Sequence, residues 1–174
     1  MKKKILSFMS VLLIATFLAS PVAAGPGIRL SGVQFSLGSL IAAGYVSGLG
    51  NSDVKMVLEG SGPAVILCTN GGRNPVPGQS SPKVSATGNQ LLDGDQNRTK
   101  NGKTAFQTIA STSEPLPWDV AGCPNSNWVG EIDFVFWENA TIYIYDLAGN
   151  QLLRQDFTCV TTRDPNSITC TPVN

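Results

Sequence analysis

The chain has 174 residues, contains no histidine, and balances 12 Lys and Arg against 12 Asp and Glu. This length suits one domain with a sizeable core and is short for two ordinary domains. The absence of histidine excludes Ser-His-Asp and Cys-His nucleophiles, most catalytic zinc sites and imidazole pH switches, which leaves carboxylates as acid–base candidates. The cations are scattered singly along the chain, so a nucleic-acid-binding face is excluded as well.

Residues 1–24 predict a cleaved secretory signal peptide of bacterial type. Lys2, Lys3 and Lys4 precede an apolar run over residues 5–18, and small residues end the segment at Ala24. The apolar run is too short for a membrane span, and no cysteine stands at the cut to carry a lipid anchor. We therefore expect residues 25–174 to form a single domain, secreted, extracellular or periplasmic, with nine Lys and Arg against twelve Asp and Glu and a net charge of −3.

Four cysteines lie in the part of the chain expected to be exported, where disulfides are permitted: Cys68, Cys123, Cys159 and Cys170. Four cysteines allow three pairings. Residues 164–167 have the composition of a turn, which would bring Cys159 opposite Cys170 and leave Cys68 to pair with Cys123. Because the chain has no CxxC spacing and no histidine, we expect these residues to hold no metal, and we expect no cofactor.

From residue 25 onward, apolar residues alternate with polar ones, as in half-buried strands, and no window has helical spacing. Gly32 shifts the phase of the first strand, as a β-bulge does. Residues 60–63, Gly-Ser-Gly-Pro, predict a turn, and residues 146–150 predict a hairpin loop. The pattern predicts an all-β, antiparallel β-sandwich, immunoglobulin-like or jelly-roll-like, with about nine strands and little or no helix. Before the final disulfide-linked pair, the expected strands cover residues 28–37, 40–46, 54–59, 64–68, 84–87, 103–109, 128–137, 140–145 and 151–158.

A polar loop carries Asp93, Asp95 and Asn97 at alternate positions, as at the start of a calcium-binding loop. Arg98 stands where such a loop needs glycine, and Thr104 stands where it needs a bidentate glutamate. A plain polar turn is the favoured interpretation, and a calcium-stabilised adhesion module stays open as an alternative.

Residues 128–145 form the densest run of strand-forming residues, and we expect them at the centre of the core. Side chains alternate between the two faces of a strand, so this segment can be divided into a core face and an outer face. The predicted core face contains Trp128, Ile132, Phe134 and Phe136, and the predicted outer face contains Val129, Glu131, Asp133, Val135 and Trp137.

Glu131 and Asp133 are the carboxylates for which catalysis is worth considering. At about 3.3 Å per residue they lie roughly 6 to 7 Å apart along the strand, close enough to influence each other's pKa values. A pair of carboxylates beside an aromatic ring is also what a glycosidase presents to a sugar. The alternative is a solvated face on which both pair with cations such as Arg154 or Lys103.

The stretch GEIDF, residues 130–134, resembles the catalytic strand of β-jelly-roll glycoside hydrolases of the laminarinase and lichenase type, which carries a Glu-x-Asp-x-x-Glu pattern. The resemblance implies that Glu131 is a nucleophile and Asp133 a helper residue. The third carboxylate of the pattern is missing, because position 136 is Phe and Glu138 lies two residues further on. The acid that would protonate the leaving sugar is therefore not supplied by this motif.

Four aromatic residues are candidates for binding a carbohydrate or a cell-surface component: Trp118, Trp137, Tyr143 and Tyr145. Trp118 can instead cap the end of a sandwich, and the tyrosines can serve as cross-strand packing. The leading hypothesis is a secreted, non-catalytic binding or structural module, either extracellular or at the bacterial cell surface. The alternative is a carboxylate-dependent glycoside hydrolase of β-jelly-roll type that uses Glu131 and Asp133.

Overall fold

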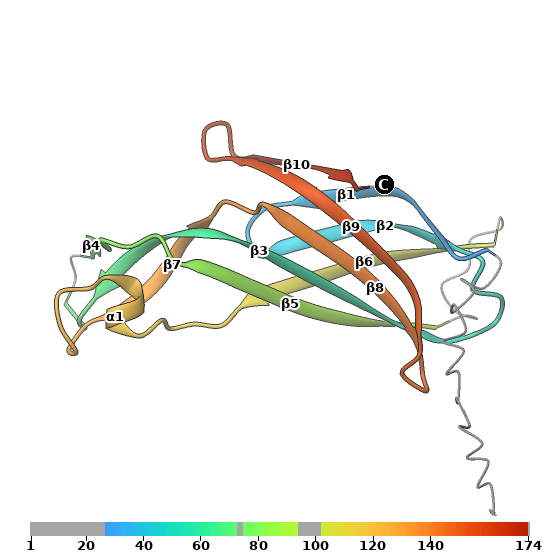
Figure 1. Ribbon diagram of the computed structural model, residues 1–174, viewed down its shortest axis with the longest axis horizontal. Helices are drawn as coiled ribbons and strands as arrows, with labels where there is room; N and C mark the ends of the chain where they lie inside the picture. Colours follow the sequence, from blue (N-terminus) through green and yellow to red (C-terminus); the bar gives the residue numbers. More distant parts are fainter. Residues whose placement is uncertain (1–26, 73–74, 94–101, 174) are drawn as a thin grey trace, which may run out of the picture.

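The computed structural model describes residues 27–72, 75–93 and 102–173, so the signal peptide predicted for residues 1–24 lies outside the described residues. The described chain is all-β with antiparallel strand pairs, as predicted, and it contains one four-residue helix. The strands are β1 (Arg29–Ser36), β2 (Leu40–Ser47), β3 (Val54–Thr69), β4 (Val76–Pro77), β5 (Lys83–Leu92), β6 (Lys103–Thr112), β7 (Val129–Val135), β8 (Asn139–Asp146), β9 (Gln151–Thr162) and β10 (Ser167–Pro172), and the helix is α1 (Trp118–Ala121) (Figure 1).

The strands form one sheet that curls back on itself. Its order is β1-β2-β6-β5-β3-β8-β9-β10, with β4 and β7 also paired to β3. The outermost strands β1 and β10 approach each other, and the ring of Phe35 in β1 meets that of Phe157 in β9 edge to face, with 5.0 Å between centroids. The result is a nearly closed cylinder. The antiparallel all-β fold is thus confirmed, and the more specific expectation of a two-layer sandwich remains a prediction.

Strand β3 organises the sheet because its 16 residues pair with four other strands. The first part, from Val54 to Pro63, lies between β5 and β8, and the part from Ala64 onward pairs with β7 and β4. Strands β7 and β8 therefore follow each other along β3, which extends across most of the molecule in Figure 1. The turn predicted for residues 60–63 is wrong, since the chain continues through them as a strand.

Two glycines interrupt the apolar pattern of β3 because other atoms occupy the space that a side chain would need. Gly60 faces the core, where a Cβ would lie 3.3 Å from the Trp137 ring and would collide with Leu40. At Gly62 a Cβ would collide with the backbone carbonyl of Phe136. The glycines thus mark close packing inside a strand, which is their other common role besides turns.

A register shift in β7 reverses the two faces of that strand. Before the shift, Ile132 packs against the core as predicted. After it, Val135 and Trp137 point inward and are 7% and 2% exposed, respectively. Phe134 and Phe136 are less buried and contact each other edge to face at 5.0 Å. The prediction that Phe134 and Phe136 form the core face, with Val135 and Trp137 opposite, is wrong because it assumed an unbroken strand.

Two other local predictions are confirmed. The pairing of β1 with β2 shifts register between Ser31 and Gln34, and Gly32 there has a φ of 59°. In the β8–β9 loop the Asp146 N–H donates to the Asn150 carbonyl at 2.9 Å, and Gly149 has a φ of 88°. The side chain and backbone N–H groups of Asn150 donate to the Asp146 carboxylate, which lowers its pKa.

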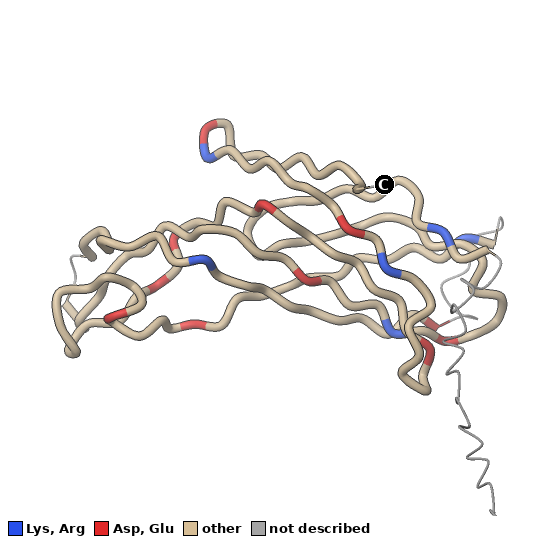
Figure 2. The backbone as a smooth tube through the Cα atoms, viewed as in Figure 1, with Lys and Arg blue, Asp and Glu red and all other residues tan. Residues whose placement is uncertain are grey.

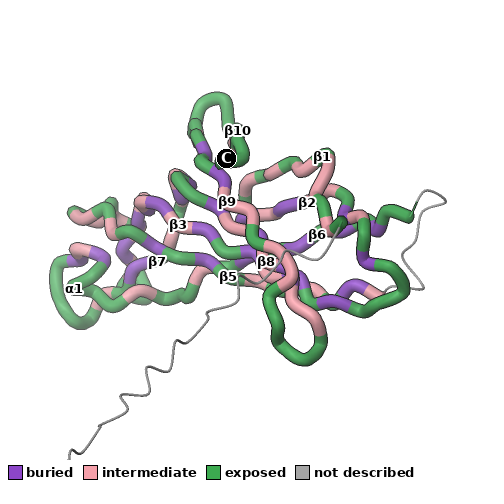
Figure 3. Tube along the Cα trace, turned by 45° about the vertical axis from the view of Figure 1, so that its right-hand side comes forward, coloured by how far each residue is buried: buried purple, intermediate pink, exposed green. Residues whose placement is uncertain are grey.

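The buried apolar residues inside the cylinder come mainly from β2, β3, β5, β6, β7, β8 and β9, while the loops at both ends are largely exposed (Figure 3). Burying one large aliphatic side chain contributes about 1.5–3 kcal/mol, so this interior is the main source of stability. The largest fully buried side chains are Leu40, Met56, Leu58, Ile66, Leu92, Ile142 and Ile144.

Both predicted disulfides, Cys68–Cys123 and Cys159–Cys170, are present. The first ties the end of β3 to the segment after α1, and the second joins residues that are paired in register across β9 and β10. Two disulfides indicate folding in an oxidising environment outside the cytoplasm. Across the described ranges, no helix has the length and apolar character required to cross a membrane.

We expect Gly62→Ala to lower the free energy of unfolding by about 1–3 kcal/mol, because the added methyl group collides with a backbone carbonyl that cannot rotate away. The neighbouring outward-facing substitution Ser61→Ala serves as the control and should change stability by less than about 0.5 kcal/mol. Urea denaturation measures both. Equal stability of the two variants would contradict the close approach of residues 136–137 to β3.

The two disulfides should contribute unequally to stability. The bridge Cys68–Cys123 spans 55 residues and Cys159–Cys170 spans 11, so chain entropy predicts about 4 and about 3 kcal/mol, respectively. Replacing both cysteines of a pair by alanine and comparing the denaturation midpoints tests this order. A larger loss on removal of Cys159–Cys170 would contradict the chain-entropy account.

Candidate functional site

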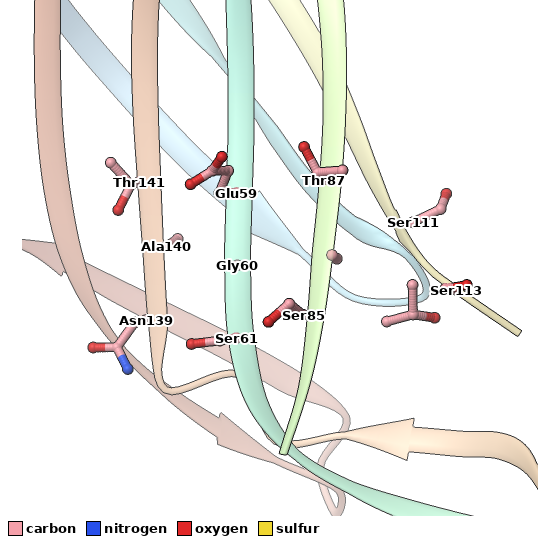
Figure 4. Close-up of a pocket in the computed structure, with 12 residues that line it drawn as sticks. Glu59, Gly60, Ser61, Ser85, Thr87, Ser111, Ser113, Asn139, Ala140 and Thr141 are labelled. Carbon is pink, nitrogen blue, oxygen red and sulfur yellow. The ribbon is translucent and has the colours of Figure 1, made fainter. Parts of the chain in front are cut away.

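A polar groove of about 570 Å³ lies on the outer face of the sheet, where β8, β3, β5 and β6 are neighbours (Figure 4). Its lining residues are short and mostly hydroxyl-bearing. The strand register arranges them in two rows that run across the four strands. The first row is Thr141, Glu59, Thr87 and Ser111, and the second is Asn139, Ser61, Ser85 and Ser113.

The alternation of side chains explains why the groove is open to solvent. Between the two rows, Gly60, Ala86 and Ala140 point into the core, so only backbone and small side chains form the floor. The outward residues on either side of this floor are Ser, Thr, Asn and one Glu, none of which is long enough to fold over and cover it. The groove is thus a consequence of small residues on both faces of the same four strands.

The side of the groove next to β6 depends on a weak strand junction. Strands β5 and β6 pair through two residues each, Ala86 with Thr112 and Thr87 with Ser111. A side chain at Gly88 would collide with the Ile109 carbonyl, so glycine permits β5 to come this close to β6. The pairing of Ser111 with Thr87 places the Ser111 hydroxyl beside those of β5.

The chemistry of the lining favours a ligand rich in hydroxyl groups. Each Ser or Thr hydroxyl has one donor and two acceptor positions, and the Asn139 amide has both kinds as well. Such groups can exchange hydrogen bonds with sugar hydroxyls in either direction. No described side chain in the groove is a Cys, Lys or Tyr, so covalent chemistry through one of these nucleophiles has no candidate here.

Charged residues are few and scattered singly over the described part of the chain (Figure 2). Two ion pairs flank the groove. Lys83 pairs with Glu138 at 3.3 Å near its second row, and Arg154 pairs with Asp156 at 3.1 Å beside its first row. Both pairs are substantially exposed, so each contributes less than about 1 kcal/mol. Glu59 is the charged residue inside the groove.

Two tyrosines continue the outer face of β8 beyond the groove. The rings of Tyr143 and Tyr145 are stacked with 5.9 Å between centroids, and both side chains are partly exposed. The Arg154 guanidinium lies over the Tyr143 ring, 5.7 Å from its centroid. This arrangement places two partly exposed tyrosine side chains and an arginine next to the hydroxyl-lined groove.

Local interactions shift the pKa values of two groups in this region. The Asp156 pKa is lowered, first by hydrogen bonds from Arg154 and then by the bond that the Thr141 hydroxyl donates at 2.8 Å. The Tyr143 pKa is raised, mainly by burial and then by the negative charge of Glu59. Near neutral pH, Asp156 is therefore ionised and Tyr143 keeps its proton.

An apolar hollow of about 400 Å³ lies further along the same face. Its lining includes Val57, Tyr145 and two strongly exposed leucines, Leu91 at 62% and Leu147 at 66%. The outer face therefore changes in character along β3 and β8, from hydroxyl-bearing at Ser61 to aromatic and aliphatic at this end.

The carboxylates predicted as a catalytic pair, Glu131 and Asp133, engage different neighbours. The Thr69 hydroxyl donates to Glu131 at 3.1 Å, while Arg163 in the β9–β10 turn donates to Asp133 at 2.7 Å. The cation that pairs with Asp133 is thus Arg163, whereas Arg154, one of the cations expected there, binds Asp156 instead.

A small cavity of about 210 Å³ adjoins Asp133. Glu114 also lines it, and one oxygen of Glu114 accepts the Ile132 N–H at 3.2 Å. Glu131 is not among the lining residues. The two carboxylates of the GEIDF motif therefore do not face one shared cavity.

The two predicted tryptophan positions differ in accessibility. Trp118 begins α1 and is 40% exposed, so it stays available as a surface for a ligand. Trp137 is 2% exposed and packs over Gly60, so it cannot contact a ligand on the outer face. Of the four aromatic candidates, Tyr143 and Tyr145 are the ones that lie next to the groove.

The calcium hypothesis lies mainly beyond the described residues. Asp95 and Asn97 fall outside them, whereas Asp93 follows the end of β5. Among the residues that the structure places, no group of three or more His, Cys, Asp or Glu could hold a metal ion.

Sequence reasoning did not identify the groove. Ser61 lies in the segment predicted as a turn, and Ser85, Thr87 and Asn139 are ordinary outward residues of strands. The available signal was the run of small polar residues at alternate positions of several strands, but their juxtaposition depends on strand order. Comparison of the chain with known protein families, curated protein sequences and solved structures finds no match.

We expect acidification to remove the stabilising effect of Asp156. Because its pKa is lowered in the folded state, its contribution is present above the unfolded pKa of about 3.9 and disappears as the pH falls through the folded value. Wild type should therefore exceed Asp156→Asn in stability near neutral pH, by under about 1 kcal/mol for this exposed pair, and the difference should vanish in acid.

Thermal melting of both proteins between about pH 3 and about pH 7 measures this difference. A gap that is the same at every pH would show that the substitution acts through packing and not through the charge.

Proposed function

We propose that the protein is a secreted, non-catalytic binding module and that the outer groove with its neighbouring tyrosines binds carbohydrate. The observation that carries this proposal is the double row of hydroxyl and amide side chains across four strands, with Glu59 as the one carboxylate among the lining residues. The disulfides support a location outside the cytoplasm, and the predicted signal peptide supports export, either to the periplasm or to the cell surface and medium.

Carbohydrate fits this face better than other ligand classes for two physical reasons. Sugar hydroxyls need partners that both donate and accept hydrogen bonds, which Ser, Thr and Asn supply. The apolar faces of sugar rings pack against aromatic side chains, and the partly exposed Tyr143 and Tyr145 lie at the end of the first row. A nucleic acid would require a cluster of cations, whereas the cations beside the groove, Lys83 and Arg154, are held by carboxylates.

We also propose that the curled sheet works as a sandwich-like scaffold of two layers. The layers would be β1-β2-β6 and β5-β3-β8-β9-β10, joined by the two-residue pairing of β5 with β6. Support comes from the core, because buried residues of both groups, such as Leu40 and Leu58, face the same interior. The groove would then lie on the outer face of the larger layer and partly over the junction.

The alternative function, a carboxylate-dependent glycoside hydrolase, has weaker geometric support. Its mechanism needs two carboxyl groups on either side of one sugar bond. Glu131 hydrogen-bonds to the end of β3 and Asp133 to the β9–β10 turn, and the two do not line a common cavity. A reducing-sugar assay on the purified protein distinguishes the two functions: turnover that disappears in Glu131→Gln supports the hydrolase and contradicts our proposal.

Blocking the groove should weaken glycan binding. Ser85→Tyr adds a large ring to the second row, and binding to the glycans recognised on an array should weaken about tenfold or more. Ser36→Tyr, the same substitution at an exposed position of β1 away from the groove, should bind like wild type. Calorimetric titration with the strongest glycan from the array measures both.

Two outcomes would contradict the proposed function. One is the absence of any bound glycan on the array for a folded, disulfide-bonded protein. The other is wild-type affinity in Ser85→Tyr, which would place the ligand elsewhere on the molecule.

A further inference from the structure

Glu59 occupies the middle of the groove. It lies in the first row, directly between Thr141 of β8 and Thr87 of β5, and its side chain is exposed (Figure 4). Neighbouring strands are about 4.8 Å apart, so each threonine hydroxyl is within reach of a small group bound to the carboxylate. Any ligand that fills the groove must therefore meet a negative charge at its centre.

This carboxylate lacks a partner among the described residues. The cations that flank the groove are already engaged, Arg154 by Asp156 at 3.1 Å and Lys83 by Glu138 at 3.3 Å. Glu59 itself makes no hydrogen bond or ion pair with any residue that the structure places. Arg154 senses the charge of Glu59 but is bound to Asp156, so no described cation makes direct contact with the Glu59 carboxylate.

The hydroxyl of Thr141 is oriented in a way that suits a cationic ligand. It donates its proton to Asp156 at 2.8 Å, so its remaining lone pairs are free to accept a hydrogen bond. An ammonium group has three N–H donors and no acceptor. The Glu59 carboxylate and the hydroxyl oxygens of Thr141 and Thr87 together present three acceptors in one row.

We propose that the groove selects glycans that bear a protonated amino group, and that Glu59 is the residue that binds this group. The inference rests on the proposed carbohydrate function and adds the ligand class. An anionic glycan is disfavoured by repulsion from Glu59. A neutral sugar gains ordinary hydrogen bonds, whereas an ammonium group gains charge-assisted hydrogen bonds, which are about twice as strong.

Three hexasaccharides with the same β-1,4-linked backbone test the inference because they differ only at carbon 2: cellohexaose with a hydroxyl, chitohexaose with an acetamide, and its fully deacetylated form with an amine. The titration is carried out at about pH 5.5, where the sugar amines are protonated. We expect the deacetylated hexamer to bind about five- to tenfold more tightly than either neutral hexamer, and the preference to weaken in high salt.

The variant Glu59→Gln keeps the size and hydrogen-bonding capacity of the side chain and removes its charge. It should bind the deacetylated hexamer about five- to tenfold more weakly than wild type does and bind neutral glycans equally well. Glu131→Gln, the same substitution on β7 away from the groove, should leave all affinities unchanged. Melting temperatures of the three proteins confirm that each is folded.

The outcomes separate this inference from the proposed function. Binding of neutral glycans to the groove, with no preference for the amine and no effect of Glu59→Gln, overturns the inference and leaves the binding function standing. Loss of affinity in Glu131→Gln as well overturns the assignment to Glu59. Failure of every hexamer and every array glycan to bind overturns both proposals.

Discussion

The packing of Trp137 against the bare backbone of Gly60 is the contact on which the rest of the fold depends. A side chain at Gly60, in the middle of β3, would collide with Leu40 and would press on the ring of Trp137, which lies between β7 and β8. A slip of one residue between β3 and β8 would turn this ring outward and expose it. The contact therefore favours one register of β3 with β8, and the positions of β9 and β10 follow from it through successive ladders.

The same register determines the outer surface. Gly60 and its neighbours Ala86 and Ala140 face inward because the core at this level is filled by large side chains from elsewhere, including Trp137 and Leu40. The residues directly before and after them in each strand must then face outward, at positions that are paired between adjacent strands. Because short polar residues occupy these paired positions, their side chains form two rows across the sheet and not a scattered set of hydroxyls. Core packing and groove geometry are two consequences of one strand alignment.

The sequence predicted features that depend on nearby residues and missed those that depend on strand order. Strand alternation, the Gly32 bulge and the Cys159–Cys170 pairing are local, and the structure contains all three. The Gly-Ser-Gly-Pro segment failed as a turn because residues 136–137, more than seventy positions away, require glycine there. The face assignment of β7 failed for a related reason, since the register shift is visible only in its pairing with β3. The groove combines four strands, so no single segment could reveal it.

The placement of the groove on paired strands has an energetic consequence for binding. Its lining residues alternate with core residues such as Leu58 and Ile142, which are 0% exposed, so the backbone beneath the ligand is already held in place. Ligand binding to such a surface requires little ordering of the chain, and less of the interaction energy is lost to conformational entropy. Hydrogen bonds from small hydroxyl groups, each worth about 0.5–1.5 kcal/mol, can then add up to useful affinity. Long loops would offer more contacts but would have to be ordered first, which favours the sheet face as the binding surface of this fold.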